Sequence, residues 1–235
     1  MEKVMYVLMG APGVIGPWVG DVLRHETVPA MRSRGVRRMQ VNVVASELGP
    51  PFGVTPEADA AQLTAALSGW VDAAERSPFD GALPDPGGSG SWSGYLVSEA
   101  EPQPNTTQAP GSQGRIPGFA QIVLLSRPEG LGWSEWQHRW QGAHTSIALA
   151  TQATFRYVQN VVLRPLTAGA PHYAAVVEEC FPLEAASDLH VYFDAVGDDG
   201  RLARHMAAMS ESCDRFMDGA APVAWTTEYV FDDQP

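Results

Sequence analysis

Lysine and cysteine are almost absent from this sequence of 235 residues. Lys3 is the single lysine, and the two cysteines, Cys180 and Cys213, form no recognisable pattern. Mechanisms that need a lysine later in the chain are therefore excluded, and nothing supports a disulfide framework. Basic residues number 15 against 27 acidic residues, which gives a formal net charge of -12. Because such a surface repels phosphates, we expect neither nucleic acid nor an anionic membrane as a partner.

Long uninterrupted apolar segments are also missing. Residues 4–20 carry no charge, but several glycines and prolines interrupt them. The segment therefore predicts neither a membrane span nor a signal peptide, and we expect a cytoplasmic protein. The metal-binding spacings HxH and HExxH are absent too, so we predict no metal site. The apolar fraction of 45% is typical of a folded protein with a sizeable core.

Two segments of the chain share the same order of features, residues 4–44 and 119–162. Each begins with an apolar strand, passes through a Gly/Pro turn and a helix that contains tryptophan, and closes with a second strand. His25 lies 17 positions before Asn42, and His144 lies 16 positions before Asn160. This agreement predicts a tandem duplication.

The composition also suggests where the two copies meet. Residues 84–118 are rich in Gly, Pro, Ser, Gln and Asn and contain one strand candidate. We therefore predict three parts, a first repeat over 1–100, a linker over 101–117 and a second repeat over 118–235. Apolar residues at helical spacing further predict an amphipathic helix over 56–76, inserted in the first repeat.

The predicted order of elements in a repeat is strand, helix, strand, strand, helix, strand. This order is typical of a ferredoxin-like α+β unit. The glycine spacing of the turn at 10–16 is also similar to that of a dinucleotide-binding turn. No Tyr-x-x-x-Lys pair accompanies it, however, and strands and helices do not alternate as a Rossmann sheet requires. We therefore expect a flexible turn between a strand and a helix there.

The segment 133–144 is the most informative part of the sequence for function. Trp136, Trp140 and His144 are spaced at i, i+4 and i+8, so a helix would place them on one face. Partial burial beside tryptophans would keep an imidazole neutral near pH 7, and a neutral imidazole can accept or relay a proton. The alternative is a core histidine that bonds a backbone carbonyl and has no catalytic role.

The strand predicted at 156–162 carries polar side chains on both faces. Asn160 points to one side, whereas Tyr157 and Gln159 point to the other. Polar groups on a buried strand need partners or a ligand. We therefore regard these three residues as candidates for orienting a ligand, with hydrogen bonds to the backbone as the equally weighted alternative.

Residues 119–182 resemble the EthD family of the dimeric α+β barrel superfamily. The resemblance rests on the tryptophan-rich helix that ends at His144 and on the strand containing Tyr157, Gln159 and Asn160. It is weaker in the first repeat, where Asp21 stands in place of Trp140. The resemblance implies two ferredoxin-like sheets that pair into a barrel. Two chains supply the sheets in single-domain relatives, but here one chain could supply both.

The known functions of this superfamily suggest several hypotheses for this protein. The superfamily includes polyketide cyclases, muconolactone isomerase, cofactor-free monooxygenases and haem-binding members. The first hypothesis is a cofactor-independent acid/base enzyme, such as an isomerase, cyclase, dehydratase or decarboxylase, that acts on a hydrophobic cyclic, polyketide-, steroid- or aromatic-like compound. The second is a non-catalytic protein that binds a hydrophobic ligand for a partner enzyme. The third is an oxygenase, or a haem protein using His172 or His205. A homodimer is also compatible with the family.

In the first hypothesis His144 is the general acid or base, and Asn160 or Tyr157 holds an oxyanion. The expected substrate-binding residues are Trp136, Trp140, Gln159, His25 and Asn42.

Overall fold

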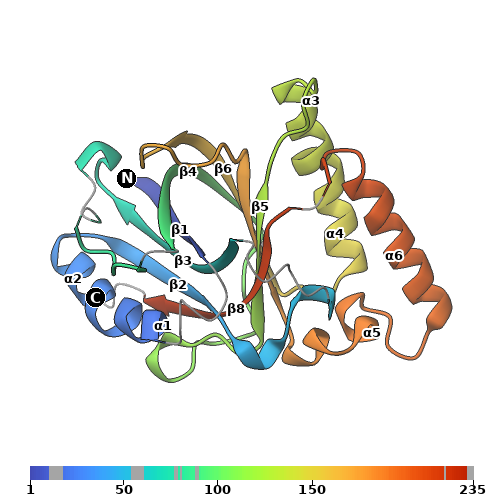
Figure 1. The fold of residues 1–235 in the computed structure, drawn as a ribbon. Coiled ribbons are helices and arrows are strands. Elements are labelled where there is room, and N and C mark those ends of the chain that lie inside the picture. The colour runs from blue at the N-terminus through green and yellow to red at the C-terminus, as the bar shows by residue number, and fades with distance from the viewer. Residues whose placement is uncertain are drawn as a thin grey trace.

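A computed structural model describes residues 1–10, 18–53, 61–76, 79, 81–87, 90–219 and 221–231. The described residues form one closed barrel of eight antiparallel strands with helices on its outside (Figure 1). The predicted α+β class is therefore confirmed. Most of the turn expected at 10–16 lies outside the described residues.

The first half of the chain supplies four strands and one helical segment. The strands are β1 (Glu2–Gly10), β2 (Arg37–Val44), β3 (Gln62–Val71) and β4 (Ser91–Gln103). The helical segment runs through α1 (Trp18–Val22), a π-helical turn (Leu23–Thr27) and α2 (Val28–Ser33). Between β3 and β4, the described residues contain only a short 3-10 turn (Ala74–Arg76).

The second half repeats this plan and adds a long helix. Its strands are β5 (Phe119–Leu125), β6 (Arg156–Pro165), β7 (Ala175–Phe181) and β8 (Val223–Phe231). Its first helical segment runs through α3 (Trp133–Gln137), a π-helical turn (His138–His144) and α4 (Thr145–Thr151). The short α5 (Leu189–Tyr192) and the long α6 (Asp199–Cys213) lie between β7 and β8.

Strand pairing shows how the two halves close the barrel. The order around it is β1-β3-β2-β8-β5-β7-β6-β4. Within each half the first strand lies between the third and the fourth, which is the ferredoxin-like order. Antiparallel pairs β2–β8 and β4–β6 then join the two sheets. Two ferredoxin-like sheets from one chain thus form the barrel, as the sequence predicts.

The alternation of side chains along β1 shows where the core lies. Val4, Tyr6 and Leu8 belong to an apolar cluster that includes residues of α1 and α2. Met5 and Val7 belong to another cluster, which lines the barrel interior. Because successive residues of a strand face opposite sides, both faces of β1 are buried, and the strand is apolar from Val4 to Met9.

The helix predicted over 56–76 is wrong where the structure describes it. Residues 62–71 form β3, which pairs with β1 and β2. Leu63, Ala66 and Leu67 do occur at helical spacing, but Ala65 and Leu67 face the helices while Leu63 and Ala66 face the barrel interior. A strand buried on both faces has no polar face to show a period of two, so spacing alone could not identify it. The strand β4 also extends to Gln103, into the first residues of the predicted linker.

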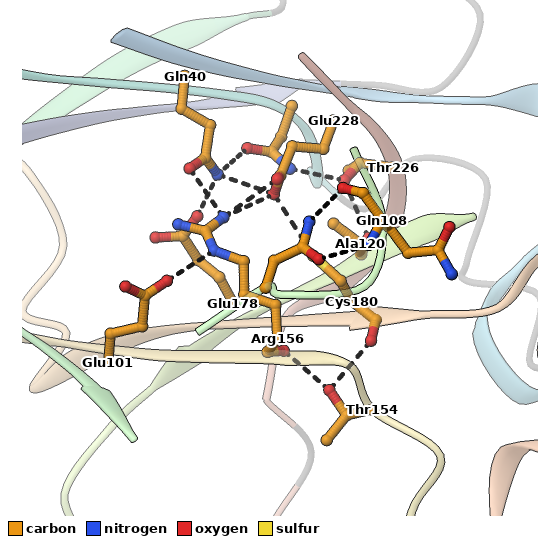
Figure 2. A network of polar contacts seen from close by, with 12 residues as sticks. Gln40, Glu101, Gln108, Ala120, Thr154, Arg156, Glu178, Cys180, Thr226 and Glu228 are labelled. Carbon is orange, nitrogen blue, oxygen red and sulfur yellow. Dashed lines mark hydrogen bonds and ion pairs between the residues drawn. The ribbon is translucent and has the colours of Figure 1, made fainter. Parts of the chain in front are cut away.

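Polar side chains fill part of the barrel interior and link the two halves. Arg156 donates to Glu228 (3.0 Å) and to Glu101 (3.0 Å), as Figure 2 shows. Lys3 donates to Glu99 (2.6 Å) and forms an ion pair with Glu178 (3.3 Å), which is fully buried. Each cation therefore contacts carboxylates from both halves, so these bonds cross from one sheet to the other.

The pKa values of two carboxyl groups in this network are shifted in opposite directions. Burial alone would raise the pKa of Glu178, but the nearby charges of Lys3 and Arg156 outweigh burial and lower it. Burial raises the pKa of Glu228, and Arg156 offsets only part of that effect. The positive charges of Lys3 and Arg156 therefore both favour the ionised form of Glu178.

Gly118 allows the start of β5 to approach β7 closely. Its φ is +90°, and a Cβ built there would lie 2.1 Å from the carbonyl oxygen of Phe181. We expect Gly118→Ala to lower the free energy of unfolding by about 2–3 kcal/mol, because both the backbone and the contact become strained. Gly169→Ala is the matched control, since Gly169 has a φ of +75° but open space around it. Urea unfolding that gave equal losses for both variants would contradict the close-contact argument.

Candidate functional site

The helical segment from α3 to α4 places its aromatic residues against the sheet. The Trp136 and Trp140 rings are fully buried, with centroids 4.9 Å apart. The Trp136 indole donates to the carbonyl oxygen of Phe216 (3.0 Å). His144 follows at the end of the π-helical turn and is also buried. The predicted aromatic face is therefore present. The π-helical turn is notable because such turns are frequent at functional sites.

The His144 ring is held between α6 and Phe216. Its Nδ1 lies 3.0 Å from the Ser212 hydroxyl oxygen, and its centroid is 4.7 Å from that of Phe216. Burial lowers the pKa of His144 to about 4. The imidazole is therefore neutral at pH 7. Among the described residues its Nε2 has no hydrogen-bond partner, which leaves that atom free for a ligand.

A cavity of about 280 Å³ lies beside His144, between the outer face of the second sheet and the helices. This volume is near the lower end of the range for small-molecule sites. Trp140 and Tyr157, two of the site residues predicted from the sequence, border the cavity. Phe52, from the first repeat, also borders it and packs edge-on against Tyr192 (5.3 Å) and Trp225 (5.5 Å). The other apolar residues that line it are Val123, Leu125, Val177, Phe193, Met209, Cys213, Phe216, Met217, Ala221 and Val223.

Glu179 is a titratable cavity residue that the sequence patterns did not predict. It lies on the outward face of β7, borders the cavity and is only 6% exposed. The Gln121 amide donates to Glu179 Oε2 (2.9 Å). Burial nevertheless raises the pKa of Glu179 to about 7, and the Gln121 bond opposes only part of that rise. Near neutral pH this carboxyl can therefore both accept and release a proton.

A chain of polar side chains continues from Glu179 along one wall of the cavity. Gln121 Oε1 accepts from the Trp225 indole (3.0 Å) and from the Tyr192 hydroxyl (3.3 Å). Tyr192 in turn accepts from the Gln152 amide (3.1 Å). Gln152 Oε1 is buried and, among the described residues, receives no hydrogen bond. The wall therefore contains one carboxyl group, and Gln152, which also borders the cavity, has one buried and unpaired carbonyl oxygen.

The structure does not bring every predicted residue to this cavity. Trp136 lies behind Trp140, and Gln159 bonds Thr145 (2.7 Å) and Gln141 (3.3 Å). Neither is among the residues that border the cavity.

The two predicted asparagines lie on the other side of the sheet, in the barrel interior. Asn160 donates to Glu178 (2.7 Å) and accepts from Lys3 (2.8 Å). Asn42 accepts from Gln40 (2.8 Å) and donates to Thr226 (3.2 Å). These bonds satisfy the amides within the polar network. His25 is exposed on the helical segment of the first repeat and belongs to no cavity described here.

Candidate metal and haem ligands are scarce. Within the described ranges no group of three or more His, Cys, Asp or Glu side chains is arranged to hold a metal ion. His172 is exposed, and His205 Nδ1 bonds the backbone oxygen of Phe193 (2.6 Å). Neither histidine borders the cavity beside His144. The two histidines considered as haem ligands, His172 and His205, therefore do not reach that cavity. None of the described helices is long and apolar enough to cross a membrane.

Comparison with known proteins gives a likeness of fold. No protein-family model and no curated protein matches the sequence. An anthrone oxidase-like protein of known structure superimposes with a TM-score of 0.54 at 10% identity, over 98% of this chain and 91% of that one. A presumed monooxygenase from Lactobacillus acidophilus NCFM gives a TM-score of 0.50 at 8% identity, over 99% and 97%. The likeness extends over nearly the whole of each chain, and this protein therefore has the dimeric α+β barrel fold, closed within a single chain.

Proposed function

We propose that this protein is a cofactor-independent enzyme that removes a proton from a hydrophobic cyclic or aromatic small molecule. The observation that carries the proposal is a carboxyl group, Glu179, on the wall of an otherwise apolar cavity. A dry apolar site strengthens electrostatic interactions and admits a flat apolar substrate. Weakly acidic C–H groups beside a carbonyl, and phenols, are the protons that such a carboxylate can accept.

Glu179 is a better candidate for the base than His144. Its pKa of about 7 means that a large fraction is ionised at neutral pH while its basicity exceeds that of an ordinary carboxylate. His144, with a pKa of about 4, is neutral but a much weaker base. The role expected for His144 from the sequence, general acid or base, is kept here as the competing assignment.

His144 has a second role open to it, as a hydrogen-bond donor to a developing oxyanion. If Ser212 donates its hydroxyl proton to Nδ1, the imidazole proton resides on Nε2 and is available to the cavity. A neutral donor can stabilise an enolate oxygen without protonating it. In this mechanism Glu179 takes the proton, His144 holds the oxygen, and Trp140 and Tyr157 form part of the wall.

The fate of the anion defines the reaction. If Glu179 returns the proton to another carbon of the substrate, the net reaction is an isomerisation without change in oxidation state. Cyclisation, dehydration and decarboxylation begin or end with the same kind of proton transfer. The proposal therefore concerns the proton transfer that these reactions share.

Oxidation by dioxygen is the second candidate. In that reaction an activated methylene group and one O₂ give a carbonyl group and one H₂O, with the electrons passing from the substrate anion to O₂. Likeness of fold to an anthrone oxidase-like protein and a presumed monooxygenase supports this candidate, although at about 10% identity it concerns the fold alone. The initial deprotonation would be the same in both reactions.

Anthrone is a suitable probe because it is a flat tricyclic ketone with an acidic methylene group. In deuterated buffer without dioxygen, the protein is expected to accelerate exchange of these protons at least about 100-fold over buffer. Mass spectrometry measures the exchange. Addition of dioxygen then tests the second candidate, with one O₂ consumed for each anthraquinone formed. Anthrone that binds but does not exchange faster than in buffer would favour a ligand-binding protein and contradict the enzyme.

A further inference from the structure

The polar wall of the cavity has a fixed direction of hydrogen bonding. An indole N–H can only donate, so the Trp225 bond (3.0 Å) requires an oxygen at the Gln121 position that faces it. The other end of the Gln121 amide is then its NH₂ group, which donates to Glu179 (2.9 Å). The indole therefore determines how the Gln121 amide is oriented.

The same direction continues to Gln152. Because Gln121 presents an oxygen, the Tyr192 hydroxyl donates its only proton to it (3.3 Å). The Tyr192 oxygen can then only accept, and the Gln152 NH₂ group donates to it (3.1 Å). Gln152 is thereby left with its carbonyl oxygen unpaired. Rotating the Gln152 amide would place two acceptors against each other, so the chain prevents that alternative.

The unpaired oxygen belongs to a residue that borders the cavity. Gln152 is 8% exposed and directly follows α4, where its backbone N–H bonds the carbonyl oxygen of Ala148 (3.0 Å). A buried acceptor without a donor destabilises a protein, and almost all such atoms are satisfied in folded proteins. A donor on a bound ligand would satisfy this one.

We infer that Gln152 recognises a hydrogen-bond donor on the substrate, so that the substrate is a hydroxylated aromatic or polycyclic compound. This inference rests on the proposed function for the location of the site, but it concerns recognition and not the proton transfer. Compounds whose oxygens are all carbonyls or ethers leave the Gln152 oxygen unpaired and bind more weakly. Glu179 and Gln152 would then contact different groups of one ligand.

A pair of bicyclic probes tests the inference. 1-Naphthol carries a donor, whereas 1-methoxynaphthalene has the same rings and oxygen but no donor. Calorimetric titration of the wild-type protein is expected to give about tenfold tighter binding of 1-naphthol. In Gln152→Met, which keeps the length of the side chain without its carbonyl oxygen, the ratio of the two affinities is expected to fall to about one to three.

Two further variants identify which side chain accepts the hydrogen bond from the ligand's donor group. Glu179→Leu is expected to retain the tenfold preference, because the Gln152 oxygen is unchanged. Gln137→Met makes the same chemical change on α3, away from this cavity, and should retain both affinities. The melting temperature of each variant shows that it is folded.

Three results would overturn the inference. They are a preference that survives in Gln152→Met, a preference lost in Glu179→Leu but kept in Gln152→Met, and failure of the wild-type protein to bind either probe. A normal preference in a protein that does not accelerate anthrone exchange would leave the inference intact. That result would instead contradict the proposed enzymatic function.

Discussion

Glu179→Gln is expected to slow proton exchange from anthrone by about 10²–10⁴-fold, the usual contribution of a positioned general base. The substitution is nearly isosteric, and the new amide oxygen can still accept the bond from Gln121. The cavity should therefore keep its shape, and anthrone should bind with an affinity within a few-fold of wild type. Initial rates of deuterium incorporation, together with calorimetric titration, separate the loss of catalysis from a loss of binding.

His144→Gln provides the matched comparison, because it replaces the neutral imidazole with another neutral hydrogen-bonding group. If Glu179 is the base, this variant should retain more activity than Glu179→Gln. The opposite order, with exchange abolished in His144→Gln and retained in Glu179→Gln, would make His144 the base. Ser212→Ala should weaken exchange only through the orientation of the imidazole.

The pH profile gives an independent test of the same assignment. The rate is expected to rise as Glu179 loses its proton, with a midpoint near its pKa of about 7. A pKa of about 4 for His144 means that this residue produces no transition near pH 6.5. The profile of kcat/KM should therefore show one ascending limb between pH 6 and 8, and this limb should be absent in Glu179→Gln.

The free energy of unfolding should also depend on the ionisation of Glu179, but it should fall where the rate of proton exchange rises. The folded protein binds the Glu179 proton more tightly than the unfolded chain does, because its pKa rises from 4.5 to about 7. Stability is therefore lost as the pH rises through this window, by roughly 3 kcal/mol at most. Relative to wild type, Glu179→Gln should become more stable over the same range. The raised pKa that suits the base thus destabilises the fold.

Most of the fold follows from patterns in the sequence. The apolar strands predicted at the start of residues 4–44 and 119–162 are β1 and β5, and the repeated order of elements gives the two ferredoxin-like sheets. The sequence does not reveal β3, since both of its faces are buried and apolar helical spacing occurs there by coincidence. Pairing between the halves involves residues far apart in sequence, and only the family resemblance suggests it.

The candidate site was only partly predictable, for a different reason. The tryptophan spacing identifies the helix face that leads to His144, and period-two alternation correctly separates Tyr157 from Asn160. Which face of the strand borders the cavity depends on where the helices pack, which alternation does not specify. A signal for Glu179 was present, however. Glu178 and Glu179 are adjacent acidic residues in an apolar strand, so each face of β7 buries one carboxyl group.

Lys3→Met is expected to lower the free energy of unfolding by about 3–5 kcal/mol, because it leaves the buried Glu178 carboxylate without its nearest cation. The loss should shrink at acid pH, where Glu178 can be protonated and the uncompensated charge disappears. Lys3→Met combined with Glu178→Gln should recover at least half of the loss, because the buried charge goes with its partner and the Asn160 oxygen vacated by Lys3 can accept from the new amide.

Arg164→Met serves as the control for that experiment. It removes the exposed Arg164–Glu75 pair (2.6 Å), which should cost less than about 1 kcal/mol. Urea unfolding at neutral and acid pH measures all four proteins. Equal losses for Lys3→Met and Arg164→Met would contradict a special role for the interior network, as would a double variant no more stable than Lys3→Met. Because the Lys3 contacts join the two halves, a large and pH-dependent loss would indicate that the buried charges help to hold the barrel closed.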